Sequence, residues 1–154
     1  MAGIKEQLRT DLTEAMRAQD EITLATLRLA LAAIMKAEVA GATPVTLTDD
    51  QVVELLRGEG KRRAEAAELY DKGDRAELAA RERAQAAVLE RYLPEEMDDD
   101  ALATIVTEEV ESARADGATG GKAMGQVIKA VRARAGAGAS GGRVAAAVKA
   151  ALGT

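Results

Sequence analysis

The sequence predicts an all-α protein, and three observations support this. Apolar residues recur at helical spacing along most of the 154 residues, and no segment shows the two-residue period of a strand. Capping residues precede the periodic segments, and glycine or proline follows them. The apolar residues are nearly all aliphatic, with abundant alanine, the best helix former, and Tyr70 and Tyr92 as the only aromatics.

The first two helices are predicted from apolar stripes and one cap. The first stripe consists of Ile4, Leu8, Leu12, Ala15 and Met16. Asp20 is placed to cap a second helix, which should run to about Val39 and end at the segment Gly41 to Pro44. Its apolar residues are Leu24, Leu27, Leu31, Ile34 and Met35.

Two longer helices should follow. Thr48 with Gln51 has the spacing of a capping box and opens the third. Its middle contains Gly58 and Gly60, which cost about 1 kcal/mol each relative to alanine, so we expect a bend or a frayed stretch there. Asp74 with Glu77 is predicted to cap the fourth helix, and Pro94 closes it.

The acidic run from Glu95 to Asp100 should act as a hinge between two domains. Its aspartates fit the N-terminus of a helix better than a divalent-metal site, because carboxylates there accept from free amides. Three short amphipathic helices follow. We therefore predict an N-terminal helical domain at 1–97, with long antiparallel helices, and a C-terminal three-helix bundle at 98–154.

The composition excludes several classes of site. Without cysteine there is no disulfide or thiolate chemistry, and without histidine the commonest general base and metal ligand are missing. We predict no catalytic residue, no metal and no cofactor. The first residues lack an apolar signal core, and no segment approaches the roughly 20 apolar residues that span a bilayer. A cytoplasmic protein with no membrane partner is therefore expected.

Positive charge is concentrated near the C-terminus. Residues 117–154 contain six basic residues and no acid, whereas residues 1–97 contain 14 basic and 19 acidic residues. This asymmetry favours an anion-facing surface, although the cations could simply solubilise two alanine-rich helices. The candidate phosphate-binding residues are Lys122, Lys129, Arg132, Arg143, Gly141 and Gly142.

Two further patterns have ordinary alternatives. Lys61, Arg62 and Arg63 form a secondary basic cluster, which is either a phosphate contact or an exposed helix face flanked by glutamates. Residues 136–141 match the letters of a dinucleotide-binding loop, but a helix rather than a strand precedes them, which favours a turn. With so few aromatics for base stacking, RNA recognition would rest on backbone and shape.

A series of short motifs resembles the GatB/YqeY family. The motifs, in chain order, are Thr26–Leu29 through Ala33–Ile34 with Glu38, Arg62–Arg63 to Tyr70, Gly73–Leu78 with Glu82, Tyr92–Pro94, Met124–Val127, and Gly141–Val144 with Val148 and Leu152. Each is weakly specific, but together they span residues 4 to 152. Four positions depart from the family pattern: Gly58 and Gly60 replace helix formers, Gln85 an acid and Ser140 an aspartate.

The resemblance implies a C-terminal domain similar to the tail of the B subunit of the tRNA-dependent amidotransferase, which helps hold tRNA. It suggests a non-catalytic module that binds tRNA or associates with amidotransferase subunits, with DNA not expected. An amidotransferase-like enzyme, a carbon–nitrogen ligase with glutamine as amide donor, is the second interpretation. A protein–protein adaptor without an RNA role, bound to another protein, is the third.

Overall fold

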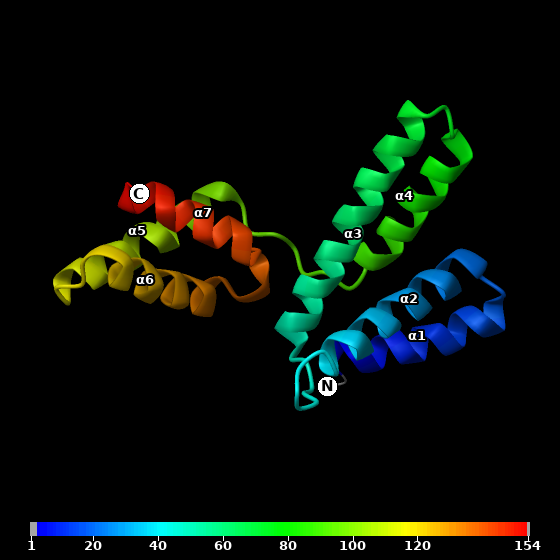
Figure 1. Cartoon of the computed structure of the whole chain (residues 1–154), viewed down its shortest axis with the longest axis horizontal. Coiled ribbons are helices and arrows are strands. Elements are labelled where there is room, and N and C mark those ends of the chain that lie inside the picture. The colour runs from blue at the N-terminus through cyan, green and yellow to red at the C-terminus, as the bar shows by residue number, and fades with distance from the viewer. Residues whose placement is uncertain (1–2, 154) are drawn as a thin grey trace. The chain divides into compact units, whose positions relative to one another are not determined.

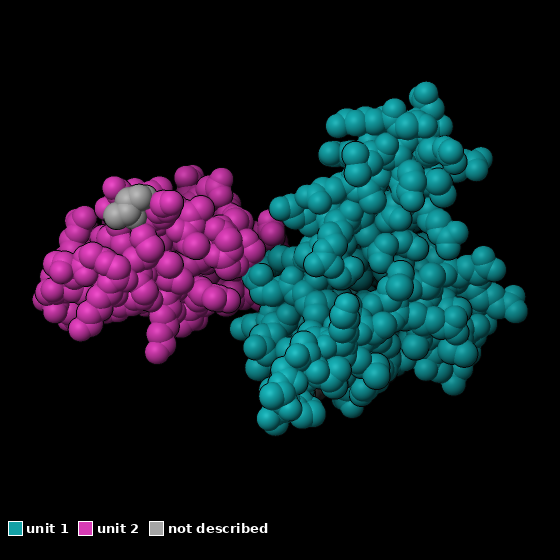
Figure 2. All heavy atoms as spheres, in the orientation of Figure 1, with its two compact units in different colours: residues 1–93 teal, residues 94–154 magenta. Residues whose placement is uncertain are grey.

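The computed structural model describes residues 3–153 and confirms the all-α class. That range contains seven α-helices, one 3-10 turn and no strand (Figure 1). The chain divides into two compact units, residues 1–93 and 94–154, drawn in different colours in Figure 2. Within residues 3–153, none of the helices combines the length and apolar character that crossing a bilayer requires.

Unit 1 begins with an antiparallel pair of helices, α1 (Ile4–Ala18) and α2 (Glu21–Glu38). The tight turn between them places Gln19 in the left-handed region, at φ 56°. Asp20 caps α2 by accepting from the Thr23 amide, as predicted. Glu38, at the other end of α2, accepts from Lys5 Nζ at 2.6 Å and so ties α2 to α1.

The other half of unit 1 is a hairpin of α3 (Asp49–Lys72) and α4 (Ala76–Glu90), which lie side by side in Figure 1. The capping box of Thr48 and Gln51 is present. The expected fraying at Gly58 and Gly60 is wrong, because α3 is continuous over 24 residues. The α-helical hydrogen-bonding pattern continues without a break through the two glycines.

The prediction for the start of α4 is also wrong. Asp74 lies in the turn before the helix with φ 57°, and the N-cap is Arg75, which makes no side-chain cap hydrogen bond. The turn is closed instead by backbone hydrogen bonds from Gly73 and Arg75 to Tyr70 O. The main-chain turn that ends α3 therefore determines where α4 begins.

An aliphatic core holds unit 1 together at the base of the hairpin. Residues from all four helices are buried there: Leu8, Leu27, Ala30, Ile34, Val52, Leu56, Val88 and Leu89. Farther along the hairpin the contact is made by Ala67 and Ala79, both essentially inaccessible. Small side chains at these two positions let α3 and α4 approach closely.

Unit 2 is a three-helix bundle of α5 (Asp99–Ala115), α6 (Gly120–Ala135) and α7 (Gly141–Leu152). Asp98 caps α5 by accepting from the Ala101 amide, so this part of the acidic run serves the helix terminus as expected. The glycine-rich segment between α6 and α7 is a 3-10 turn, Gly136–Gly138. The core is aliphatic and includes Leu102, Val106, Val110, Val127, Val131, Val144 and Val148.

Unit 2 begins four residues before the boundary predicted at 97, and Met97 accounts for the difference. Its amide donates to Gly138 O at 2.7 Å, and its side chain packs against the core of the three helices. The segment before α5 is therefore part of the bundle and not a free hinge.

Candidate nucleic-acid interface

The exposed side of α6 carries three of the candidate cations. Val127 and Val131 of this helix are buried, whereas Lys122, Lys129 and Arg132 are all exposed on the other side. Lys122 and Lys129 are seven residues apart and lie about 20° apart around the helix axis, and the three cations span about 15 Å of its length. They therefore form one continuous basic stripe.

These charges are not neutralised within the part of the chain that the structure describes. Among residues 3–153, no ion pair involves Lys122, Lys129, Arg132 or Lys149. Arg134 behaves differently, since it contacts Glu108 at 2.7 Å and Glu109 at 3.1 Å on α5. Hydrogen bonds to Glu108 and then to Glu109 raise the pKa of Arg134 above its ordinary value. The stripe on α6 thus has no counter-charge paired with it among residues 3–153.

Arg132 also lies next to the start of α7. A Cβ added to Gly141 would lie 3.6 Å from the nearest guanidinium nitrogen of Arg132, so this side chain rests against the glycine. Ser140 caps α7 by accepting from the Arg143 amide, which leaves the amides of Gly141 and Gly142 free of a cap hydrogen bond. The structure therefore brings Arg132 next to Gly141 at the start of α7.

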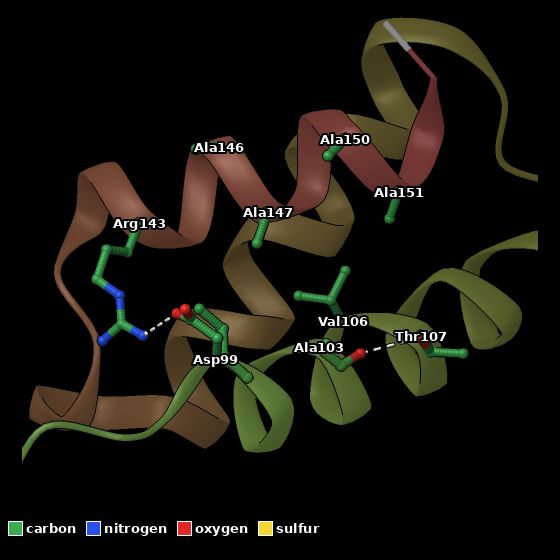
Figure 3. Close-up of a pocket in the computed structure, with 10 residues that line it drawn as sticks. Asp99, Ala103, Val106, Thr107, Arg143, Ala146, Ala147, Ala150 and Ala151 are labelled. Atoms are coloured by element: carbon green, nitrogen blue, oxygen red, sulfur yellow. Dashed lines mark hydrogen bonds and ion pairs between the residues drawn. The ribbon is translucent and has the colours of Figure 1, made fainter.

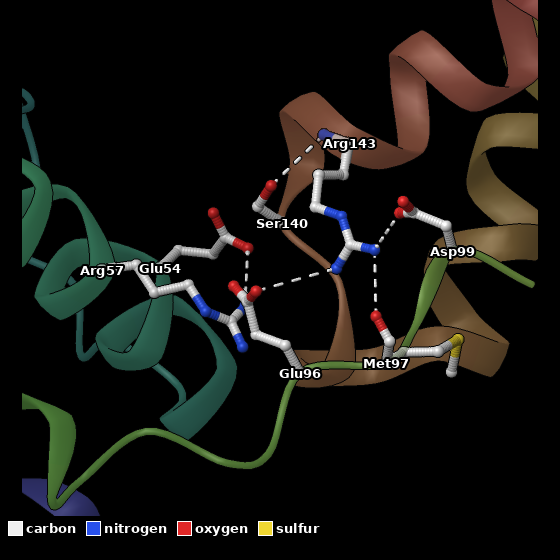
Figure 4. Close-up of polar contacts among 7 residues, drawn as sticks. All are labelled: Glu54, Arg57, Glu96, Met97, Asp99, Ser140 and Arg143. Carbon is white, nitrogen blue, oxygen red and sulfur yellow. Dashed lines mark hydrogen bonds and ion pairs between the residues drawn. The ribbon is translucent and has the colours of Figure 1, made fainter. Parts of the chain in front are cut away.

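Arg143 is held by the segment that leads into α5 (Figure 4). Its guanidinium donates to Met97 O and to Asp99 Oδ1, both at 2.9 Å, and Glu96 lies 3.9 Å away. A cation in the first turn of a helix opposes the helix dipole, and these contacts supply a physical reason for its presence. Sequence reasoning missed them because the partners lie 44 to 47 residues away in the chain.

The secondary cluster on α3 is paired throughout. Arg62 contacts Glu59 at 2.6 Å, and Lys61 lies 4.0 Å from Glu65. Arg63 points towards α4, where it donates to Gln85 Oε1 at 2.8 Å and contacts Glu82 at 3.3 Å. This geometry matches the exposed, glutamate-flanked face for Lys61 and Arg62, and it gives Arg63 a structural role in the hairpin.

Unit 2 also contains a groove of ≈ 510 Å³ between α5 and α7, drawn in Figure 3. Its walls are mainly alanine methyl groups, and the ion pair of Asp99 and Arg143 closes one end. A second hollow of ≈ 470 Å³, in unit 1, is polar and includes Asp11 and Tyr92. In residues 3–153, no three carboxylates are grouped so as to hold a metal ion.

The arrangement in unit 2 is chemically suited to holding an anion. All nine acidic residues of unit 2 precede Gly117, whereas six of its seven basic residues follow it. Of the α6 cations, Arg134 pairs with acids of α5, whereas Lys122, Lys129 and Arg132 form no ion pair among residues 3–153. Lys129, Arg132 and Gly141 could each contact one phosphate oxygen.

The fold and this basic stripe define a class of small helical proteins with a three-helix C-terminal unit, and comparison identifies the family. A family model described as Yqey-like protein matches residues 5–152. An uncharacterised protein of Schizosaccharomyces pombe is 33% identical over 93 residues, which cover 60% of this chain and 74% of the yeast protein. The chain belongs to the YqeY-like family.

Proposed function

We propose that the protein is a non-catalytic module that binds tRNA through the basic stripe of α6 and the start of α7. The observation that carries the proposal is the stripe itself: Lys122, Lys129 and Arg132 are exposed and unpaired within residues 3–153. The resemblance of unit 2 to the tail of an amidotransferase subunit that holds tRNA supports the choice of ligand. It also makes amidotransferase subunits the protein partners to test first.

The residues have different roles in this proposal. Lys122, Lys129 and Arg132 bind successive phosphates, and the amides of Gly141 and Gly142 donate hydrogen bonds to a further phosphate oxygen. Arg143 acts as a positioning residue, because its guanidinium is already committed to Met97 and Asp99. It fixes the start of α7 next to Arg132, so its replacement alters the geometry of the site without removing a phosphate contact.

The test is a salt titration of tRNA binding to the wild type and to the triple variant Lys122→Ala, Lys129→Ala, Arg132→Ala. Each phosphate contact contributes about 0.9 to the slope of log K against log salt, so the triple variant should lose up to about 2.7 units of slope. Circular dichroism checks that the variant folds.

The matched control removes the same charge from exposed positions of unit 1, with Lys72→Ala, Arg75→Ala and Arg81→Ala. This control should keep the wild-type slope. If the α6 variant and the control behave alike, the stripe is only a solvated surface. If the wild type does not bind tRNA near physiological salt, the adaptor interpretation replaces this one.

A further inference from the structure

Helix α2 and its C-cap expose four large aliphatic side chains that no other described helix covers. Ile22, Leu29, Met35 and Val39 are 38%, 51%, 59% and 64% exposed, respectively, while its opposite side packs into the core of unit 1. At about 100° per residue, Ile22, Leu29 and the exposed Ala32 lie within about 80° of one another around the helix axis, whereas Met35 lies about 120° from Leu29. The first three form an apolar stripe, a kind of surface that binds another apolar surface. The side of α2 that carries Ile22, Leu29, Ala32 and Lys36, with Glu21 at its edge, is called the α2 face below.

The groove of unit 2 has the complementary shape. Its two walls, α5 and α7, start at the same end, because Arg143 of α7 bonds to Asp99 of α5. Leu102 and Val106 are buried beneath it, and the alanines along α7 leave room that larger side chains could fill (Figure 3). A groove of this kind accepts the apolar face of a third helix.

The charged residues on the two surfaces are opposite in sign and similar in spacing. On the α2 face, Glu21 and Lys36 are 15 residues apart, about 22 Å at 1.5 Å per residue. On α5, Asp100 and Arg114 are 14 residues apart, about 21 Å. All four are exposed, and none forms an ion pair within residues 3–153. With α2 antiparallel to α5, Lys36 faces Asp100 and Glu21 faces Arg114.

We propose that the α2 face of one copy of the chain docks into the α5–α7 groove of a second copy, antiparallel to α5. The same register places Leu29 near Thr107 and Ala32 near Ala103, so Leu29 enters the groove between α5 and the alanines of α7. The contact is heterologous, since each copy supplies a face to one neighbour and a groove to another.

The first experiment is sedimentation velocity of the full chain. One docked helix buries less than the roughly 1,200 Å² of a stable interface, so the wild type should associate between about 10 and 500 µM. Its mass should rise above the 16.1 kDa of one chain in this range. Leu29→Glu on the α2 face and Ala150→Glu in the groove should each weaken association by more than about tenfold, since both bring a charge into an apolar contact.

Matched controls place the same substitution elsewhere. Leu78→Glu replaces an exposed leucine of α4, and Ala145→Glu replaces an exposed alanine of α7 that does not line the groove. Both should associate like the wild type. A monomeric wild type at the highest concentration overturns the proposal, and so does association that Leu29→Glu and Ala150→Glu leave unchanged.

A mixing experiment tests the heterologous geometry. The Leu29→Glu chain keeps an intact groove and the Ala150→Glu chain an intact α2 face, so an equimolar mixture should form a 1:1 complex although neither chain associates alone. No recovery on mixing contradicts the proposal. Lys36→Glu and Asp100→Lys should each weaken association a few-fold and together in one chain restore it, because exposed ion pairs contribute little individually.

Discussion

At the scale of single residues, the contact between Tyr92 and Asp11 closes unit 1. The Tyr92 hydroxyl donates to Asp11 Oδ2 at 2.5 Å across 81 residues of sequence. Partial burial, and then the hydrogen bond to Asp11, raise the pKa of Tyr92 well above its ordinary value of 10.0. The folded chain therefore binds this proton more tightly than the unfolded chain does.

Tyr92→Phe should lower the free energy of unfolding by about 1.5–3 kcal/mol at neutral pH, because a hydrogen bond to a charged group is lost. Urea unfolding followed by circular dichroism measures this. An unchanged midpoint would mean that water satisfies Asp11 equally well.

The same pair predicts a pH effect. A raised pKa contributes stability that is fully present below the unfolded value and is lost as the pH rises above about 10. The wild type should lose stability between about pH 10 and 11, and Tyr92→Phe should lose less over the same interval. Parallel loss in both proteins would assign the alkaline effect to other groups.

Two residues that depart from the family pattern show how substitutions are accommodated. Ser140 caps α7 through its hydroxyl, the role that an aspartate would have. Gln85 is buried and accepts from Arg63, while neighbouring Glu82 supplies the negative charge. Both departures therefore keep the hydrogen bond that the position needs.

At the scale of secondary-structure elements, α3 contains two glycines, Gly58 and Gly60, that lower the stability of the helix. A Cβ at Gly58 or Gly60 would meet nothing within 4 Å. Gly58→Ala and Gly60→Ala should each raise the free energy of unfolding by about 0.4–1 kcal/mol, because alanine restricts the unfolded chain.

Gly136→Ala is the control for these two substitutions. Its site is equally open but has φ 53°, so alanine should destabilise there. Thermal unfolding of the three variants checks the prediction. A loss of stability from Gly58→Ala or Gly60→Ala would indicate that α3 needs flexibility at these positions.

Sequence reasoning predicted the helices well where a local signal determines them. Asp20, the pair Thr48 and Gln51, and Asp98 are caps whose partners lie within three residues, and all three caps are present. It failed at Asp74, because the turn after α3 is closed by backbone hydrogen bonds to Tyr70 O and not by a side-chain cap. It grouped Met35 with the apolar residues of α2 without separating buried from exposed positions. Met35 is 59% exposed, and the apolar period of α2 is weak because apolar residues occur on nearly all of its sides.

The candidate site was predictable only in part. The exposure of Lys122 and Lys129 follows from helical spacing within one element, which sequence shows directly. The pairing of Arg134 with Glu108 and Glu109, and that of Arg143 with Asp99, depends on how separate helices pack. No local pattern distinguishes these paired arginines from Arg132, which forms no ion pair among residues 3–153.

At the scale of the whole molecule, unit 2 has its own core, so a fragment of residues 94–154 should fold without unit 1. A fragment of residues 98–154 lacks Met97 and its contacts with Gly138 and Arg143. It should be less stable by about 2–4 kcal/mol, the cost of a lost buried side chain and its hydrogen bonds.

Circular dichroism with thermal unfolding of both fragments measures the difference, and Met97→Ala in the longer fragment separates the side chain from the backbone contacts. Equal stability of the two fragments would show that the segment before α5 adds nothing. Failure of both fragments to fold would show that unit 2 does not fold without unit 1.

The link between Arg143 and the segment before α5 has a consequence for synthesis. Unit 1 is complete once residue 93 has been added, and the 61 residues of unit 2 then take about 3–12 s at bacterial and eukaryotic elongation rates. During that interval the contact between Asp11 and Tyr92 can form, because both residues have been synthesised. The contact between Asp99 and Arg143 cannot form until Arg143 has been added, 44 residues after Asp99. A message that ends prematurely before codon 143 thus yields a folded unit 1 followed by an unanchored acidic segment and an uncovered α5.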